Sequence, residues 1–241
     1  MSKRIISIIL SLFILVINSN AQDKLFMNIG GTFVNSYVVR GVKYGKSSFQ
    51  PDVTLSYKGA FFNIWSSIPF DNSNFKEFDI TIGYKHKKGF SAIITDYYIA
   101  YPEVKNGDDN YFNLKKGHSY EAQIGYEIKY FSMKWYTTFA GADGVNKNGK
   151  RAYTSFLQLS VPLYLQKFNL IFDFGATPWG TTSFSTDRFA VTDLSVTLAK
   201  DIFIHKYFTI PIFAKAGVNP HLKDPYFVVG IRFSCDPFSL K

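Results

Sequence analysis

The feature that most constrains the fold is a two-residue alternation that begins at Tyr120 and continues to Phe139. In its first half, one face carries Tyr120, Ala122, Ile124, Tyr126, Ile128 and Tyr130, and the other carries Glu121, Gln123, Gly125, Glu127 and Lys129. A period of two is typical of a β-strand that lies between two different surroundings. The alternation resumes after Phe131-Ser132, which predicts a hairpin. A soluble sandwich and an outer-membrane barrel both fit this hairpin, because both give a strand one apolar and one polar face.

Length and composition narrow the choice. A chain of 241 residues suits one β-barrel domain, and an aromatic content of 18% suits the two interfacial belts of a membrane barrel. The net charge of +9 is spread over the chain without a nucleic-acid motif, so we expect no nucleic-acid partner. The single cysteine, Cys235, excludes an internal disulfide. The four histidines have no metal-ligand spacing, so we expect neither a metal nor a cofactor.

The N-terminal residues 1–21 are typical of a signal peptide. Lys3 and Arg4 form a charged region, and an apolar run from Ile5 to Ile17 follows. Ser19 and Ala21 place small residues at the two positions that a signal peptidase reads, so we expect the mature chain to begin at Gln22. The apolar run is too short to cross a bilayer as a helix.

Twelve segments of the mature chain have the length and composition of barrel strands. They are 25–34, 49–57, 60–67, 76–86, 89–100, 118–129, 132–140, 152–165, 168–177, 190–200, 207–217 and 225–234. We therefore predict an all-β fold, an antiparallel up-and-down transmembrane barrel of about 12 strands that spans residues 22–234. Pro237 disfavours further pairing, so residues 235–241 are predicted to be a short periplasmic tail.

The connections between these segments alternate in length. Short turns are expected at 57–59, 87–89, 131–132 and 166–167, with a slightly longer one at 201–206. Long polar loops are expected at 35–50, 68–75, 101–117, 141–151, 178–189 and 218–224. Outer-membrane barrels have short periplasmic turns and long external loops, whereas a sandwich has no reason to alternate them. This rhythm favours the barrel and predicts that the protein lies in the outer membrane of a Gram-negative cell.

In such a barrel the polar face of each strand meets the lumen. This rule, with Arg40 added at the external mouth, gives the candidate pore-lining residues Arg40, Asp79, Lys85, Asp96, Glu121, Glu127, Lys134, Asp173, Asp193, Lys215 and Arg232. Charges of both signs fit a water-filled channel, but they also fit an interior that paired charges fill completely. For Arg40 two interpretations stay open, an ion pair with a carboxylate such as Asp79 or a solvated position in the loop.

Some outer-membrane barrels hydrolyse lipids, and a serine hydrolase needs Ser, His and an acidic residue within hydrogen-bond reach. The chain has no Gly-x-Ser-x-Gly motif. His118 and Ser119 are neighbours in sequence, so on a strand they point to opposite faces and cannot form a dyad. We expect no enzymatic activity, with a lipid-acting barrel enzyme as the alternative.

Several short motifs resemble the TorF-type porins. They are Tyr37-Val38-Val39-Arg40-Gly41 with Phe49-Gln50-Pro51-Asp52, then residues 60–67, 77–84 and 97–102, and Glu121 ahead of a Gly-Tyr strand. The likeness covers most of the mature chain and implies an outer-membrane barrel that forms a pore, without a catalytic residue. One departure is the tail that follows Phe233, where such barrels usually end on the terminal aromatic.

The resulting hypothesis is a porin-like channel for passive diffusion of small hydrophilic solutes. Its expected partners are outer-membrane lipids, those solutes and the outer-membrane assembly machinery. A plugged barrel with a structural or adhesive role stays open as a further alternative.

Overall fold

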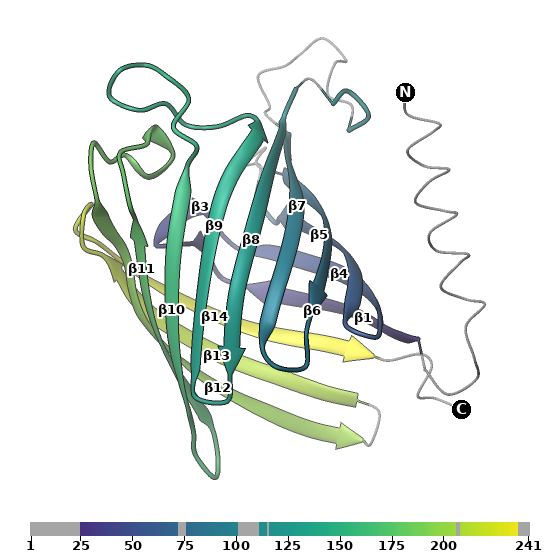
Figure 1. Ribbon diagram of the computed structural model, residues 1–241. Helices are drawn as coiled ribbons and strands as arrows, with labels where there is room; N and C mark the ends of the chain where they lie inside the picture. Colours follow the sequence, from purple (N-terminus) through teal and green to yellow (C-terminus); the bar gives the residue numbers. More distant parts are fainter. Residues whose placement is uncertain (1–24, 72–75, 101–110, 115, 206–207, 236–241) are drawn as a thin grey trace.

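The computed structural model describes residues 25–71, 76–100, 111–114, 116–205 and 208–235. The predicted signal peptide and all of the predicted tail except Cys235 lie outside these residues. Twelve antiparallel strands close into a barrel in which each strand pairs with its neighbours in sequence order, and β1 closes the sheet against β14 (Figure 1). Within the described ranges, no helix is long and apolar enough to cross a membrane.

The barrel strands have the following bounds: β1 (Phe26–Val34), β4 (Ser48–Tyr57), β5 (Ala60–Pro69), β6 (Lys76–Lys85), β7 (Phe90–Ala100), β8 (His118–Ile128), β9 (Phe131–Gly141), β10 (Ser155–Tyr164), β11 (Asn169–Thr177), β12 (Ala190–His205), β13 (Phe208–Asn219) and β14 (Asp224–Cys235). The remaining elements are two short strands, β2 (Tyr37–Val39) and β3 (Val42–Gly45), and a 3₁₀ turn, η1 (Thr182–Phe184).

The predicted all-β barrel and its twelve strands are confirmed. The largest error lies at residues 201–206, where a turn was expected and β12 instead continues to His205. The charged residues Lys200 and Asp201 do not end β12, because they and the following Ile202 and Phe203 all pair with residues of β13. The hairpin of β2 and β3 was not predicted, because the segment 35–50 looks like one long polar loop.

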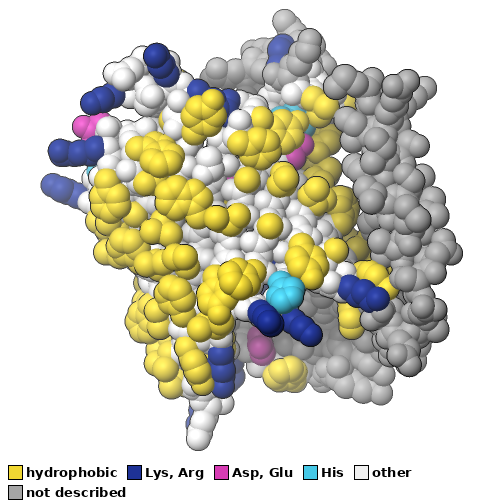
Figure 2. Space-filling model, viewed as in Figure 1, with side chains coloured by type: hydrophobic (Ala, Val, Ile, Leu, Met, Phe, Trp, Pro, Cys, Tyr) yellow, Lys and Arg dark blue, Asp and Glu magenta, His cyan; other side chains and the backbone are white. Residues whose placement is uncertain are grey.

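The register gives each strand an outer and an inner face. In the central hairpin, Ile124 pairs with Trp135 on the outer face, and 64% of its side chain is exposed. Glu121 points inward and is only 4% exposed. Many apolar side chains cover the outer surface of the wall, with white polar and backbone atoms between them (Figure 2). In water, a sheet with this distribution would expose many large apolar side chains to solvent, which is unfavourable. A hydrocarbon environment suits such an outer face better.

Long loops and short turns lie at opposite ends of the barrel. In Figure 1 the loops after β9 and β11 extend from the upper end, and the turns after β8 and β10 lie at the lower end. The first residue of β1, Phe26, pairs with Ser56 beside a short turn, and Cys235 at the end of β14 pairs with Ile29 near the same end. The start of β1 and the end of β14 therefore both lie at the end of the barrel that carries the short turns.

Candidate functional site

The loop between β1 and β4 folds into the lumen as a small hairpin, here called the lumen hairpin (residues 36–47), with strands β2 and β3. Its turn residues Arg40 and Gly41 have φ values of 53° and 77°, a left-handed conformation that tight hairpin turns need. The Asn219 side chain donates a hydrogen bond to the Gly41 carbonyl at 3.2 Å. Gly41 also packs against the backbone of Thr192 in β12 so closely that a Cβ would collide with its carbonyl.

An apolar contact holds the first strand of the lumen hairpin. Val38 packs against the buried side chains of Val34, Tyr226 and Val228, and Phe213 packs against the same cluster. These residues come from β1, β13 and β14 and face inward. The cluster is a small hydrophobic core inside the barrel, and it anchors the hairpin to one side of the wall.

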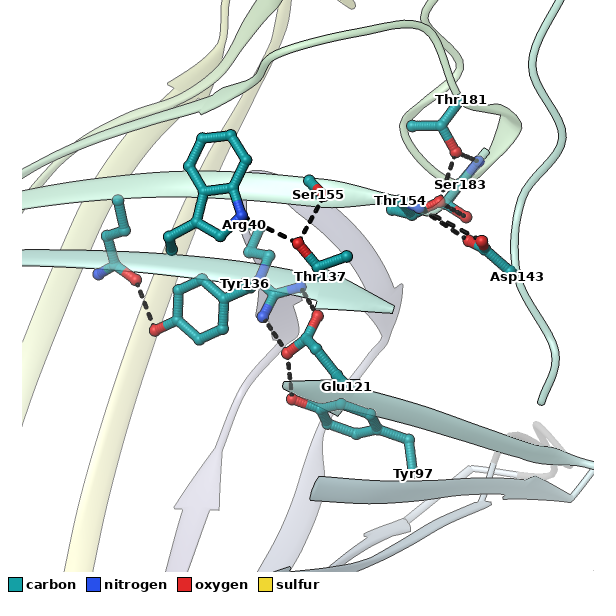
Figure 3. Close-up of polar contacts among 12 residues, drawn as sticks. Arg40, Tyr97, Glu121, Tyr136, Thr137, Asp143, Thr154, Ser155, Thr181 and Ser183 are labelled. Carbon is teal, nitrogen blue, oxygen red and sulfur yellow. Dashed lines mark hydrogen bonds and ion pairs between the residues drawn. The ribbon is translucent and has the colours of Figure 1, made fainter. Parts of the chain in front are cut away.

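The turn of the lumen hairpin reaches the other side of the barrel through Arg40. Both guanidinium NH₂ groups donate to the carboxylate of Glu121 in β8, each at 2.7 Å. The guanidinium also lies over the rings of Tyr136, 4.2 Å from the centroid, and Phe156, 5.2 Å away. The Tyr97 hydroxyl donates to the same carboxylate at 3.0 Å (Figure 3). Arg40 is therefore neither solvated nor paired with Asp79, and a bidentate pair with Glu121 fastens the hairpin across the lumen.

Beside the lumen hairpin lies a cavity of about 390 Å³, here called the mouth cavity. Its volume falls within the range of roughly 300–1,000 Å³ that is usual for small-ligand sites. Its lining mixes rings and carboxylates from both the hairpin and the wall: Tyr37, Tyr44, Glu77, Tyr97, Glu121 and Asp143. Hydroxyl groups of Thr154, Thr182 and Ser183 complete the side that is formed by the loops.

The carboxylates at this level differ in their partners. Glu121 is paired with Arg40, and Asp143 lies 3.4 Å from the Arg151 guanidinium. Glu77, which is 6% exposed, accepts one side-chain hydrogen bond, from the Tyr37 hydroxyl at 2.9 Å. Asp79, which is 7% exposed, has an Oδ1 atom without a hydrogen-bond partner among the described residues.

On the side of the lumen formed by β11 to β14, the charges pair with one another. Lys215 lies 3.8 Å from Asp173 and 3.6 Å from Asp193, and the Tyr226 hydroxyl donates to Asp193. Asp173 also accepts a hydrogen bond of 2.6 Å from Ser160.

Two more ion pairs lie inside the lumen. Arg232 binds Asp52 through contacts of 2.5 and 2.9 Å, and Lys134 lies 3.4 Å from Glu127. Lys85, the last residue of β6 before a short turn, places its ammonium 5.5 Å from the ring centroid of Phe61. All these predicted residues thus lie on the lumen side, and their lining of an open pore stays a prediction.

Asp96 is the exception, and the prediction that it points into the lumen is wrong. It pairs across the sheet with Ile80 and Tyr120, which lie on the outer face, whereas its neighbours Thr95 and Tyr97 face inward with Glu121. The alternation misleads here because β7 carries apolar Ile93 on its lumen face and the carboxylate of Asp96 on its outer face. In Figure 2, acidic and histidine atoms are visible among apolar groups on the upper part of this outer wall.

On the outer wall, Asp96 belongs to a polar cluster that a loop residue covers. Its carboxylate lies 2.8 Å from Nδ1 of His118 and accepts a hydrogen bond of 3.2 Å from the Tyr111 hydroxyl. Nε2 of His118 lies 2.8 Å from the Tyr111 carbonyl, and His118 is only 2% exposed. Burial, followed by the charge of Asp96, raises the pKa of Tyr111, so its hydroxyl stays protonated and can donate. The cluster lies near the loop end, where a charge on the outer wall costs least.

The residues missed from the sequence are Tyr37, Glu77, Tyr97 and Tyr136. Glu77 had a usable signal, because it lies two residues before Asp79 and so shares its face. The tyrosines had none, since a barrel strand carries tyrosine on either face.

Among the described residues, no group of three or more His, Cys, Asp and Glu side chains is placed to hold a metal ion. Ser119 lines the mouth cavity, whereas His118 pairs with Tyr98 on the outer wall. The chemistry that the described lumen favours is recognition by charge, hydrogen bonds and aromatic rings.

No protein-family model matches the chain, and no curated protein matches it. Among solved structures, it is similar to a KdgM porin at 8% identity and a TM-score of 0.46, over 86% of this chain and 98% of that one. It is also similar to a NanC porin at 10% identity and a TM-score of 0.43, over 87% and 98%. An outer membrane channel from Pseudomonas putida F1 gives 12% identity and a TM-score of 0.42, over 90% and 97%. Similarity at this level goes no further than the fold, and membership of the TorF-type family stays a prediction.

Proposed function

We propose that the protein is a channel of the outer membrane through which small hydrophilic solutes diffuse passively, with the lumen hairpin as its constriction. The observation that carries the proposal is the partial exposure of the lumen charges. The side chains of Lys215, Lys134 and Arg232 are 25%, 30% and 30% accessible, and that of Glu127 is 61% accessible. Charges that only filled a dry interior would have to be fully buried, at a large desolvation cost.

The outer surface supports a position in a membrane. Large apolar side chains such as Ile124, Phe172 and Phe227 are 64%, 47% and 56% exposed on the outer face. In this setting the long loops face the exterior and the short turns the periplasm. The folded chain then has lipids as its surroundings, and the outer-membrane assembly machinery is the partner that inserts it.

A plugged barrel is the second candidate, and the lumen hairpin is the observation that favours it. Arg40 and Val38 fix the hairpin to opposite sides of the wall, so the hairpin crosses the lumen and occupies part of it.

Planar-bilayer recording separates the two candidates. The refolded mature chain is compared with a variant in which residues 36–47 are replaced by a short Gly-Ser linker. A channel with a constriction should conduct in its unaltered form and conduct more strongly without the hairpin. If only the variant conducts, the barrel is plugged and the channel proposal is wrong. If neither conducts, although both show the heat-dependent gel mobility of folded barrels, the proposal is equally wrong.

A further inference from the structure

The carboxylates inside the barrel are unevenly paired. Glu121, Asp143 and Asp52 each lie within ion-pair distance of an arginine: Arg40, Arg151 and Arg232, respectively. Glu77 and Asp79 are as deeply buried as these three, and no lysine or arginine of the described residues forms an ion pair with either. The Glu77 carboxylate has one hydroxyl donor, and Asp79 Oδ1 has no donor.

The two carboxylates share one face of β6, and of the two Glu77 lines the mouth cavity. They lie two residues apart on β6, so both point to the lumen. Glu77 lines the mouth cavity, and so does Tyr97, which pairs with Asp79 across the sheet. Burying a carboxylate without a partner is costly, and a bound cation removes that cost.

Aromatic rings surround these carboxylates. Trp65 and Tyr97 flank Asp79 as its partners in the two adjacent strands. The Tyr37 ring lies 5.6 Å from Trp65 and 5.9 Å from Tyr44, between centroids. Ring faces next to carboxylates are the usual means of binding an ammonium group, whereas a metal ion requires more oxygen or nitrogen ligands than these two groups supply.

We infer that the mouth cavity is a binding subsite for an organic cation, a primary or quaternary ammonium compound. Glu77, Tyr37 and Tyr97 line it, and Asp79 and Trp65 adjoin that lining in the sheet as a second counter-charge and a further ring. This rests on the proposed channel function, because a solute must enter the lumen to reach the cavity. It also specifies the class of solute that the proposed channel would bind, namely organic cations.

Choline is a suitable probe, and 3,3-dimethylbutanol is its neutral isostere. Titration calorimetry of the folded full-length barrel in detergent micelles should show choline binding with an affinity about tenfold or more above that of the isostere. Equal affinities, or no heat with either choline or putrescine, would overturn the inference. This comparison needs no variant, so a substitution that fails to fold cannot leave the inference untested.

Two variants then locate the site. Glu77→Gln and Asp79→Asn keep the shape of each side chain and remove its charge, so each should weaken choline binding about tenfold or more. Glu127→Gln is the matched control, since Glu127 is a lumen carboxylate at the other end of the barrel, paired with Lys134. Equal affinity in all four proteins would place the cation elsewhere and contradict the assignment.

Bilayer recording keeps this inference separate from the channel proposal. Ion conductance without choline binding would overturn the subsite and leave the channel intact. Choline binding without conductance would support the subsite and overturn passive diffusion.

Discussion

Arg40 contacts side chains from three neighbouring strands of the wall. Its guanidinium is paired with Glu121 and covered by Tyr136 and Phe156. Arg40→Ala leaves the Glu121 carboxylate, which is 4% exposed, with the Tyr97 hydroxyl as its one remaining side-chain donor among the described residues. Breaking a buried pair in this way costs about 3–5 kcal/mol. We expect a loss of that order in the free energy of unfolding, measured by guanidinium titration in lipid vesicles.

Two controls test the cause of that loss. Adding Glu121→Gln to Arg40→Ala removes the unpaired charge and should restore part of the stability. Lys43→Ala breaks a pair with Asp224 whose two side chains are 45% and 43% exposed, so it should cost about 1 kcal/mol or less. A double variant no more stable than Arg40→Ala would show that Glu121 is not the source of the loss.

His118 is a second residue for which the structure makes a sharp prediction. His118→Ala removes the contacts of the imidazole with Asp96 and with the Tyr111 carbonyl. Buried groups left without a partner cost about 1–3 kcal/mol, so amide exchange in the peptide around Tyr111 should accelerate about tenfold. His221→Ala is the matched control, because His221 lies near the Ser185 carbonyl in another loop. Unchanged exchange around Tyr111 in His118→Ala would show that the contacts of His118 do not hold Tyr111 in place.

At the scale of elements, the barrel strands could be predicted from the sequence and the lumen hairpin could not. Apolar side chains outside and charges inside give each barrel strand a period of two, and that period is readable without any knowledge of the partner strand. The lumen hairpin has no such pattern, because Val38 faces a small core while Arg40 faces a carboxylate 81 positions away in sequence. Asp96 was misplaced for a related reason, since its partners come from a loop and from the start of β8.

The turn of the lumen hairpin supplies a prediction at this scale. Gly41→Ala adds a Cβ that collides with the Thr192 carbonyl, at a φ of 77°. Gly149 has a similar φ of 70°, but nothing lies near the place that its Cβ would occupy. Gly149→Ala should therefore cost only the left-handed strain of about 1–2 kcal/mol, and Gly41→Ala clearly more. The measurement is again the free energy of unfolding by guanidinium titration. Equal losses in the two variants would argue against the packing of the hairpin on β12.

At the scale of the whole molecule, the two faces of the wall decide what kind of protein this is. Ile124→Arg places a charge in the apolar outer band and should cost about 2–4 kcal/mol if it lies near the midplane of a bilayer. Gln123→Arg, on the lumen side, should cost much less. A water-soluble β-sandwich would show the same order of sensitivity, so stability alone does not identify the solvent that Ile124 contacts.

Cysteine labelling separates lipid from water at these two positions. In a Cys235→Ser background, a cysteine that replaces Ile124 should react with a lipid-soluble maleimide and only slowly with a charged one, because the outer face contacts hydrocarbon. A cysteine that replaces Gln123 should react with a small water-soluble maleimide, because Gln123 pairs with Tyr136 on the lumen face. If neither reagent labels the cysteine at position 123, the lumen is plugged. The channel proposal is then wrong, although the barrel fold is unaffected. If the charged reagent prefers position 124, water rather than lipid covers the outer wall, and the proposed membrane position is wrong.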